Sequence, residues 1–451
     1  MKTKIIITGV ILISLIFSGC LKKKQQAVPQ IPLEVWGIFD DSDVFTAINS
    51  TFEQNNPFVP KVTYRKITDR NVKEFEKELT DALASGHGPD IVFFKNSWLP
   101  KHGNKLAPMP NSEQALADFK NTFIDVAQQD FIYKNYIFAK PLYCDTLALY
   151  YNNNILNQAG LVKPPATWDE LKQYTKLLTK IDKYGNIKQS TIALGRAKDP
   201  GGINRAGDIV ALMMMQGGAV MNEGGSLYAE FNKSLDNSGD PGVIALNFFT
   251  AFANSAGPLY SWNTKMPYSV DAFRYGQTAM MINYSYWYDR LKRSDPKLDF
   301  SIAPVPQSGV ENKTVNYPNY WGLAVIKNKN IPANSGYTNA DRIRESWRYI
   351  NFITGKPAPG SQFDPTKHYL SMTHKPAARR DLIEEQKNDP ILGVFARQAL
   401  TAKSWRQVDN LAIDEIFVDM IDVVNRGAMG VGEAIKTAEE RINALVRTKT
   451  K

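Results

Sequence analysis

The chain has 451 residues, of which 43% are hydrophobic and 22% are charged, and its formal net charge is +9. This length is sufficient for two domains, each with its own hydrophobic core. The positive charges are scattered along the chain, so the charge does not indicate a nucleic-acid partner. The one basic run, Lys22-Lys23-Lys24, lies near an apolar N-terminal segment and instead favours contact with anionic lipid.

The first 19 residues have the pattern of a secretory signal peptide. Lys2 and Lys4 provide a charged start, and residues 5–17 form an apolar run. The run is too short for a comfortable membrane span. We therefore expect residues 1–19 to act as a signal peptide and the body of the protein to be exported.

Cys20 follows the small residues Ser18 and Gly19, and this sequence resembles the lipobox of bacterial lipoproteins. In that family the Cys is acylated and becomes the first residue of the mature chain. The usual residue three positions before the Cys is Leu, whereas this chain has Phe17. The resemblance implies a lipid on Cys20 and a tether over residues 20–32, and the alternative is an uncleaved anchor helix.

Only two cysteines occur, Cys20 and Cys144. If Cys20 carries lipid, no disulfide can form within one chain. An exported protein of this size needs none, because a large core stabilises it without covalent links.

The segment after the tether alternates strand and helix patterns. Asp40 to Asp43 supplies helix-capping chemistry after the first strand, and residues 91–94 form a short apolar run typical of a strand buried on both faces. The expected elements are strands at 33–38, 62–64 and 91–94 and helices ending at 55 and beginning at 72. This order predicts an α/β lobe with right-handed crossovers.

The same alternation continues to the end of the chain. Thr167 and Glu170 form a capping-box pattern that predicts the start of a helix. Further strands are expected at 146–151, 279–282 and 321–326, and further helices around 347–353 and from 432 onward. The whole chain therefore belongs to the α/β class.

Six motifs together resemble the extracellular solute-binding proteins of ABC importers, in the large family that includes the sugar binders. Each motif alone is weak, but their order and spacing are specific. The motifs are ASGHGPDIV at 84–92, PLYCDT with LYYN between 141 and 152, PATWDEL at 165–171, GQTAMMIN at 276–283, YWGLA at 320–324 and PAAR at 376–379.

The resemblance implies two α/β lobes joined by a hinge that the chain crosses near 140–145, 302–306 and 355–359. Lobe 1 is then expected at 33–140 plus 305–356, and lobe 2 at 141–304 plus 357–451. Ligand is expected between the lobes, where binding stabilises the closed form. The carboxyl ends of strands in open α/β sheets also favour this location.

The resemblance further implies a monomer outside the cytoplasm that captures a carbohydrate and delivers it to an ABC permease. Such a ligand needs aromatic platforms together with carboxylates and amides. The expected ligand contacts are Asp40, Asp41, Lys95, Asn96, Trp98, Tyr143, Asp145, Trp262, Tyr284, Tyr286, Trp287, Tyr320, Trp321, Trp405 and Arg406.

Structural roles remain open for several of these residues. One of Asp40 and Asp41 is expected to cap a helix, Asp145 is a possible cap, and isolated tryptophans such as Trp262 are often core. Many sugar binders have an acidic residue after the strand at 91–94, whereas this chain has Lys95. A lysine there suits an anionic sugar, or the alignment is shifted by one residue.

No motif of an enzyme is present. The sequence contains no nucleophile elbow, phosphate loop or zinc-helix motif, and its four histidines have no metal-ligand spacing. We therefore expect no catalysis, no metal and no cofactor. Two alternatives stay open. The same scaffold could bind a polyamine, peptide or phosphorylated compound, or the protein could be a surface-anchored glycoside-active enzyme. The sequence alone does not reveal the pair of carboxylates that such an enzyme needs, because their separation in space is what counts.

Overall fold

The computed structural model describes residues 30–449 except 69–70, 223–224, 235–238 and 310–312. The expected signal peptide, the lipidation of Cys20 and nearly all of the tether lie outside the described residues. Within the described part of the chain, no helix combines the length and the apolar character that a membrane span requires.

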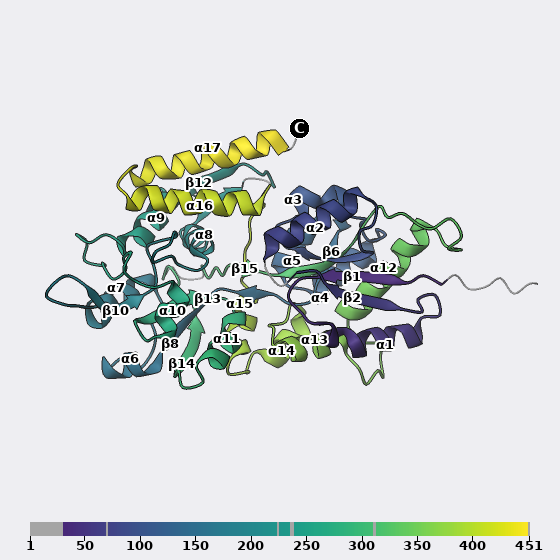
Figure 1. Cartoon of the computed structure of the whole chain (residues 1–451), viewed down its shortest axis with the longest axis horizontal. Helices are drawn as coiled ribbons and strands as arrows, with labels where there is room; N and C mark the ends of the chain where they lie inside the picture. Colours follow the sequence, from purple (N-terminus) through teal and green to yellow (C-terminus); the bar gives the residue numbers. More distant parts are fainter. Residues whose placement is uncertain (1–29, 69–70, 223–224, 235–238, 310–312, 450–451) are drawn as a thin grey trace, which may run out of the picture.

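The first sheet has five strands in the order β2-β1-β3-β16-β6, and it forms the centre of lobe 1 (Figure 1). β1, β2 and β3 are parallel, whereas β16 runs antiparallel to both β3 and β6. The strands are β1 (Leu33–Gly37), β2 (Val62–Lys66), β3 (Ile91–Lys95), β6 (Ala139–Pro141) and β16 (Trp321–Val325).

Helices cover this sheet. The helix expected from residue 72 is confirmed: Asn71 accepts a hydrogen bond from the Glu74 N–H, and Phe75 and Leu79 are buried. The α-helices of this part are α1 (Thr46–Asn55), α2 (Val72–Ala84), α3 (Leu99–His102), α4 (Glu113–Thr122), α5 (Asp125–Phe131), α12 (Asn339–Thr354), α13 (Pro365–Thr373) and α14 (Arg380–Gln386). Short 3₁₀ turns at Ser42–Phe45 and Gly103–Lys105 and the hairpin of β4 (Ile132–Tyr133) and β5 (Tyr136–Ile137) complete it.

The second sheet has the order β14-β8-β13-β10-β9 and forms the centre of lobe 2. Its central strand β13 is buried along its whole length, as the apolar run had predicted. The strands are β8 (Ala148–Asn152), β9 (Lys180–Ile181), β10 (Ile187–Ile192), β13 (Thr278–Asn283) and β14 (Phe300–Pro304), and a separate hairpin joins β11 (Ala219–Asn222) to β12 (Ala229–Ser234).

The capping residues predicted for lobe 2 are in place, since Thr167 accepts from the Glu170 N–H at the start of α7. The last helix was expected from residue 432 and runs from Val431. The helices are α6 (Asn153–Gln158), α7 (Trp168–Leu178), α8 (Ala206–Gln216), α9 (Pro241–Ala251), α10 (Ser269–Arg274), α11 (Tyr286–Ser294), α15 (Leu392–Ala399), α16 (Asn410–Asn425) and α17 (Val431–Lys449).

Each lobe has its own hydrophobic core. One core gathers residues between 31 and 144 and between 320 and 383, and the other gathers residues between 147 and 317 and from 405 to 442. β7 (Asp145–Thr146) and β15 (Pro318–Asn319) pair antiparallel where the chain passes from one lobe to the other. α15 forms the third connection, because Phe395 packs in one core and Ala396 in the other.

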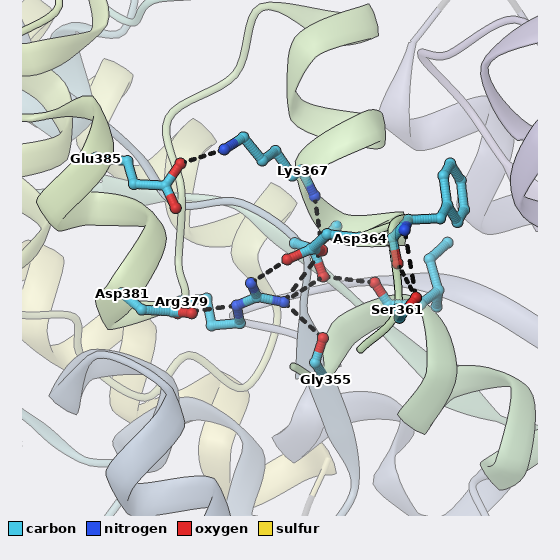
Figure 2. A network of polar contacts seen from close by, with 10 residues as sticks. Gly355, Ser361, Asp364, Lys367, Arg379, Asp381 and Glu385 are labelled. Atoms are coloured by element: carbon cyan, nitrogen blue, oxygen red, sulfur yellow. Dashed lines mark hydrogen bonds and ion pairs between the residues drawn. The ribbon is translucent and has the colours of Figure 1, made fainter. Parts of the chain in front are cut away.

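The segment after α12 packs on lobe 1, although residues 357–451 had been assigned to lobe 2. The buried Arg379 guanidinium explains this packing (Figure 2). It donates to the Gly355 carbonyl at 2.5 Å and bonds the Asp364 and Asp381 carboxylates, which joins the end of α12 to α13 and α14. The exact lobe boundaries stay a prediction.

Candidate ligand-binding site between the lobes

A pocket of about 550 Å³ lies where the two lobes meet. Lobe 1 contributes the segment from Asn96 to Leu106, the end of α5 with Tyr133, and Phe138; lobe 2 contributes Gly225, Leu227, Trp405 and Arg406. The volume is in the range of small-molecule sites. Because both lobes line it, any movement between them changes its shape.

Aromatic rings and polar groups alternate in the wall of the pocket. Trp405 is held against Phe231 and Phe417, with ring centroids 5.7 and 6.2 Å away. The Arg406 guanidinium lies over the Tyr133 ring at 5.3 Å and so connects the two lobes by a cation–π contact. Rigid rings beside polar side chains suit a ligand that has apolar faces and hydroxyl groups.

Asp130 is a buried carboxylate in the same wall. It accepts hydrogen bonds from Asn96 Nδ2 at 3.1 Å and from the Tyr320 hydroxyl at 2.7 Å, and also from the Ser404 hydroxyl. Burial raises its pKa to about 6, and these donors oppose the rise. Ser404 approaches from the segment that leads into lobe 2, so Asp130 also joins the lobes.

A smaller cavity of about 20 Å³ adjoins the pocket and shares Asn96, Ser97 and Trp405 with it. Its lining brings together Lys95 of lobe 1 and Asp208 and Asp414 of lobe 2. Burial lowers the pKa of Lys95, and burial together with the nearby Asp208 raises that of Asp414 to about 6. Among the described residues no ion pair joins these three charges; Asp208 accepts a hydrogen bond from the Tyr284 hydroxyl at 2.8 Å, and the cavity has room for about one water molecule.

Lys95 therefore does not form an isolated positive site. Its ammonium group contacts Ser97 Oγ at 3.5 Å and lies in the field of Asp414 and Asp208. The expectation of an anionic sugar, which depended on Lys95 alone, loses its support, because the lysine already faces carboxylates.

Arg205, which the sequence prediction did not include, interacts with the Asp208 and Asp414 carboxylates of the smaller cavity without lining it. It precedes α8 in the left-handed conformation, with φ 59° and ψ 33°, which is uncommon for a residue with a side chain. Its guanidinium lies 5.9 Å from the Tyr284 ring. Burial opposes its charge, but Tyr286 and Asp208 more than compensate, so its pKa rises.

The structure separates the roles of Asp40 and Asp41. Asp40 is buried, and it binds the Lys375 ammonium at 2.5 Å and the Tyr369 hydroxyl at 2.7 Å. Lys375 also lies over the Tyr143 ring at 4.5 Å. Asp41 is exposed and pairs with Lys66, and its side chain makes no cap hydrogen bond to the following turn.

The Asp145 carboxylate is hydrogen-bonded by other residues of the chain. Its carboxylate accepts from the Ser285 N–H at 3.0 Å, from the Ser285 hydroxyl at 2.8 Å and from the Thr146 N–H at 2.9 Å. Burial raises its pKa to about 7 despite these donors. Because Asp145 lies in β7 and Ser285 precedes α11, this contact fixes the hinge strand to lobe 2.

The aromatic residues after β13 have different surroundings. Tyr284 is fully buried and donates to Asp208 Oδ2 at 2.8 Å. Tyr286 and Trp287 are partly buried, and the Arg290 guanidinium lies over them at 5.1 and 5.3 Å. Tyr286 and Trp287 line neither of the two cavities, and Tyr284 holds Asp208 by its hydrogen bond.

Four other expected contacts are enclosed by protein. Trp98, Trp262, Tyr320 and Trp321 are at most 2% exposed. Trp262 lies in the core of lobe 2 and donates from Nε1 to the Gly201 carbonyl at 2.7 Å. Trp321 packs against Trp98 with ring centroids 5.0 Å apart. These residues have packing roles in this structure, because their rings have no free face for a ligand.

Of the expected residues, Lys95, Asn96, Trp405 and Arg406 line the two cavities. Sequence reasoning missed Tyr133, Asp130, Asp208 and Asp414, which also line them. The sequence carries no local signal for most of them, because they are single residues within helices or hairpins. No group of three His, Cys, Asp or Glu able to hold a metal occurs in the described ranges.

Comparison with known proteins identifies the class of protein that this architecture defines. The family model for bacterial extracellular solute-binding proteins matches residues 43–358. The chain belongs to this family. The members are solute-binding components of transporters, a class distinct from enzymes.

Several proteins resemble the chain over most of its length. The chain is 24% identical over 357 residues to a maltotriose-binding protein of Pyrococcus abyssi, covering 77% of this chain and 69% of that protein. It is 21% identical to the maltodextrin-binding protein MdxE of Bacillus subtilis, covering 85% of each. The sugar-binding protein MalE of Xanthomonas citri superposes with a TM-score of 0.72 at 17% identity, covering 93% of this chain and 98% of that one. This likeness establishes the two-lobed α/β fold.

Proposed function

We propose that the protein binds a neutral oligosaccharide in the pocket between the lobes and delivers it to an ABC import permease. The pocket of about 550 Å³ carries the proposal, because both lobes supply its aromatic and hydrogen-bonding groups. The relatives of this chain include proteins named for binding maltotriose and maltodextrin.

The adjoining charges favour a ligand rich in hydroxyl groups. Each hydroxyl both donates and accepts, so it can donate to a carboxylate such as Asp130 and accept from a cation such as Arg406. The linings of the two cavities together hold three cations, Lys95, Lys327 and Arg406, and three carboxylates, Asp130, Asp208 and Asp414, so they carry no net formal charge for a ligand to neutralise. A neutral sugar is therefore preferred over a uronate or a polyamine.

The test is a thermal-unfolding screen of the body from Gln30 onward, with maltotriose, longer maltooligosaccharides, uronates, polyamines and peptides. A ligand that binds only the folded state raises its stability. A shift with neutral oligosaccharides, and recovery of the sugar intact, would support the proposal. A shift only with peptides, polyamines or uronates would replace the proposed ligand, and recovery of cleaved sugar would indicate an enzyme.

We also propose that a lipid on Cys20 anchors a monomer to the cell membrane, with the body outside the cytoplasm. The family's extracellular role and the lipobox-like sequence before Cys20 support this. Cys20→Ser should release the protein from the membrane fraction. Continued retention of the variant would favour an uncleaved anchor helix instead.

A further inference from the structure

One group of contacts between the lobes lies beside the pocket and takes no part in lining it. On the side of lobe 1 it involves α2 and the short helix α3, which follows β3. On the side of lobe 2 it involves the beginning of α16 and the end of α17, which Figure 1 shows reaching toward α3. The residues concerned are Glu76, Trp98, Lys101, Asp409, Asn410 and Lys449.

Lys101 bridges the two lobes. Its ammonium group lies 2.6 Å from Glu76 Oε1 of α2 and 3.0 Å from Asp409 Oδ2, which precedes α16. Both carboxylates have side chains only 8% exposed. Burial alone would raise their pKa values, but His102 and Lys101 hold the pKa of Glu76 below its ordinary range, and Lys449 and Lys101 do the same for Asp409, so both are ionised.

Further charges surround this bridge from both lobes. His102 Nε2 lies 2.6 Å from Glu76 Oε1, and Lys105 contacts the other ring nitrogen of His102 at 2.8 Å. Lys449 at the end of α17 pairs with Asp409. Glu76 and Asp409 therefore each have a partner in their own lobe, and Lys101 is the cation that joins them across the boundary.

A second contact lies next to this bridge. The Trp98 indole Nε1–H donates to Asn410 Oδ1 at 3.0 Å, and Trp98 is fully buried. Asp409 also caps α16 by accepting from the Ala412 N–H. The two bonds from lobe 1 therefore end on adjacent residues at the rigid beginning of one helix of lobe 2.

The same segment of lobe 1 forms the wall of the pocket. Leu99 and Pro100 line the pocket, while their neighbours Trp98 and Lys101 make the contacts to lobe 2. Separation of the lobes would break both contacts and move this wall away from Trp405 at the same time.

We propose that Lys101–Asp409 and Trp98–Asn410 form a latch that holds the lobes closed and limits the rate at which bound ligand leaves. Lys101 and Trp98 are positioning residues: they act through α3 and do not contact the ligand. The inference about ligand release depends on the proposed carbohydrate function, whereas the inference about closure does not.

The test uses the full chain in detergent, with the variants Lys101→Met and Asn410→Ala. Neutron scattering with contrast-matched detergent measures the radius of gyration, and stopped-flow tryptophan fluorescence measures dissociation of maltotriose. Both variants should have a larger radius of gyration. Dissociation should be about tenfold to a hundredfold faster, because each variant loses one buried or charge-assisted hydrogen bond, with association little changed.

Two controls separate a latch from a general effect on folding. Lys77→Met removes an exposed lysine of α2 that pairs only with Asp81 within the same helix, so it should behave as wild type. Lys101→Arg keeps the charge and should restore slow dissociation. Circular dichroism confirms that each variant is folded.

The outcomes distinguish the two proposals. A larger radius of gyration without maltotriose binding would support the latch and contradict the proposed ligand. If the scattering and the dissociation rate of both variants equal those of Lys77→Met, the latch is overturned. If maltotriose does not bind, unchanged scattering alone overturns it.

Discussion

Arg379→Met should strongly destabilise the protein, because it removes a buried cation from between two carboxylates. The Arg379 side chain is 2% exposed, and the Asp364 side chain with which it pairs is 16% exposed. The variant would leave Asp364 without this partner and the Gly355 carbonyl without its donor (Figure 2). Removing one partner of a buried ion pair costs about 3–5 kcal/mol of unfolding free energy. For a chain of 451 residues, that corresponds to a fall in melting temperature of roughly 3–5 °C.

The neighbouring residue provides a matched control. Arg380 pairs with Asp125, and the two side chains are 36% and 75% exposed. Arg380→Met should therefore cost less than about 1 kcal/mol. Urea unfolding followed by circular dichroism gives both values. If the two variants lose the same stability, or if Arg379→Met loses less than about 1 kcal/mol, Arg379 does not hold the segment after α12 on lobe 1.

Three further predictions concern the hinge, the cleft and the core. Folding raises the pKa of Asp145 from 3.8 to about 7, so the folded chain binds the proton more tightly than the unfolded chain. The free energy of unfolding should therefore fall as pH rises between these values. Asp145→Asn should flatten this fall in urea unfolding, and an unchanged slope would contradict the prediction. Arg406→Met should weaken maltotriose binding by about tenfold to a hundredfold in calorimetry, whereas Arg290→Met, at a residue that lines neither cavity, should not, and equal affinities would exclude Arg406 from the site. Trp321→Ala should cost about 3–5 kcal/mol of stability, and wild-type stability would contradict its enclosed position.

Local patterns were sufficient where one segment determines its own conformation. The apolar run at 91–94 is the buried part of β3, and the apolar periodicity after residue 72 gives α2. Thr167 and Glu170 form the predicted cap of α7. These features depend on hydrogen bonds and burial patterns within a few residues, so the sequence shows them directly.

The order of the motifs along the chain also predicted the overall fold. Solute-binding architecture follows from several weak motifs spaced along the chain, and the family match over residues 43–358 confirms it. The hinge crossings were harder to locate. β15 at 318–319 pairs with β7 between the two cores, and this pairing joins residues far apart in sequence, which no local pattern shows.

The binding site was decided almost entirely by tertiary structure. Trp98 and Trp321 were both expected to contact the ligand, but packing encloses both rings. Trp98 donates to Asn410, which is 312 residues away, and Arg205 gains its place beside Tyr284 from a left-handed turn that no local pattern announces. The sequence alone determined the elements, the class and the exported character expected of the chain. Which side chains meet between the lobes depends on long-range packing, because residues from distant segments become neighbours only when both cores have formed.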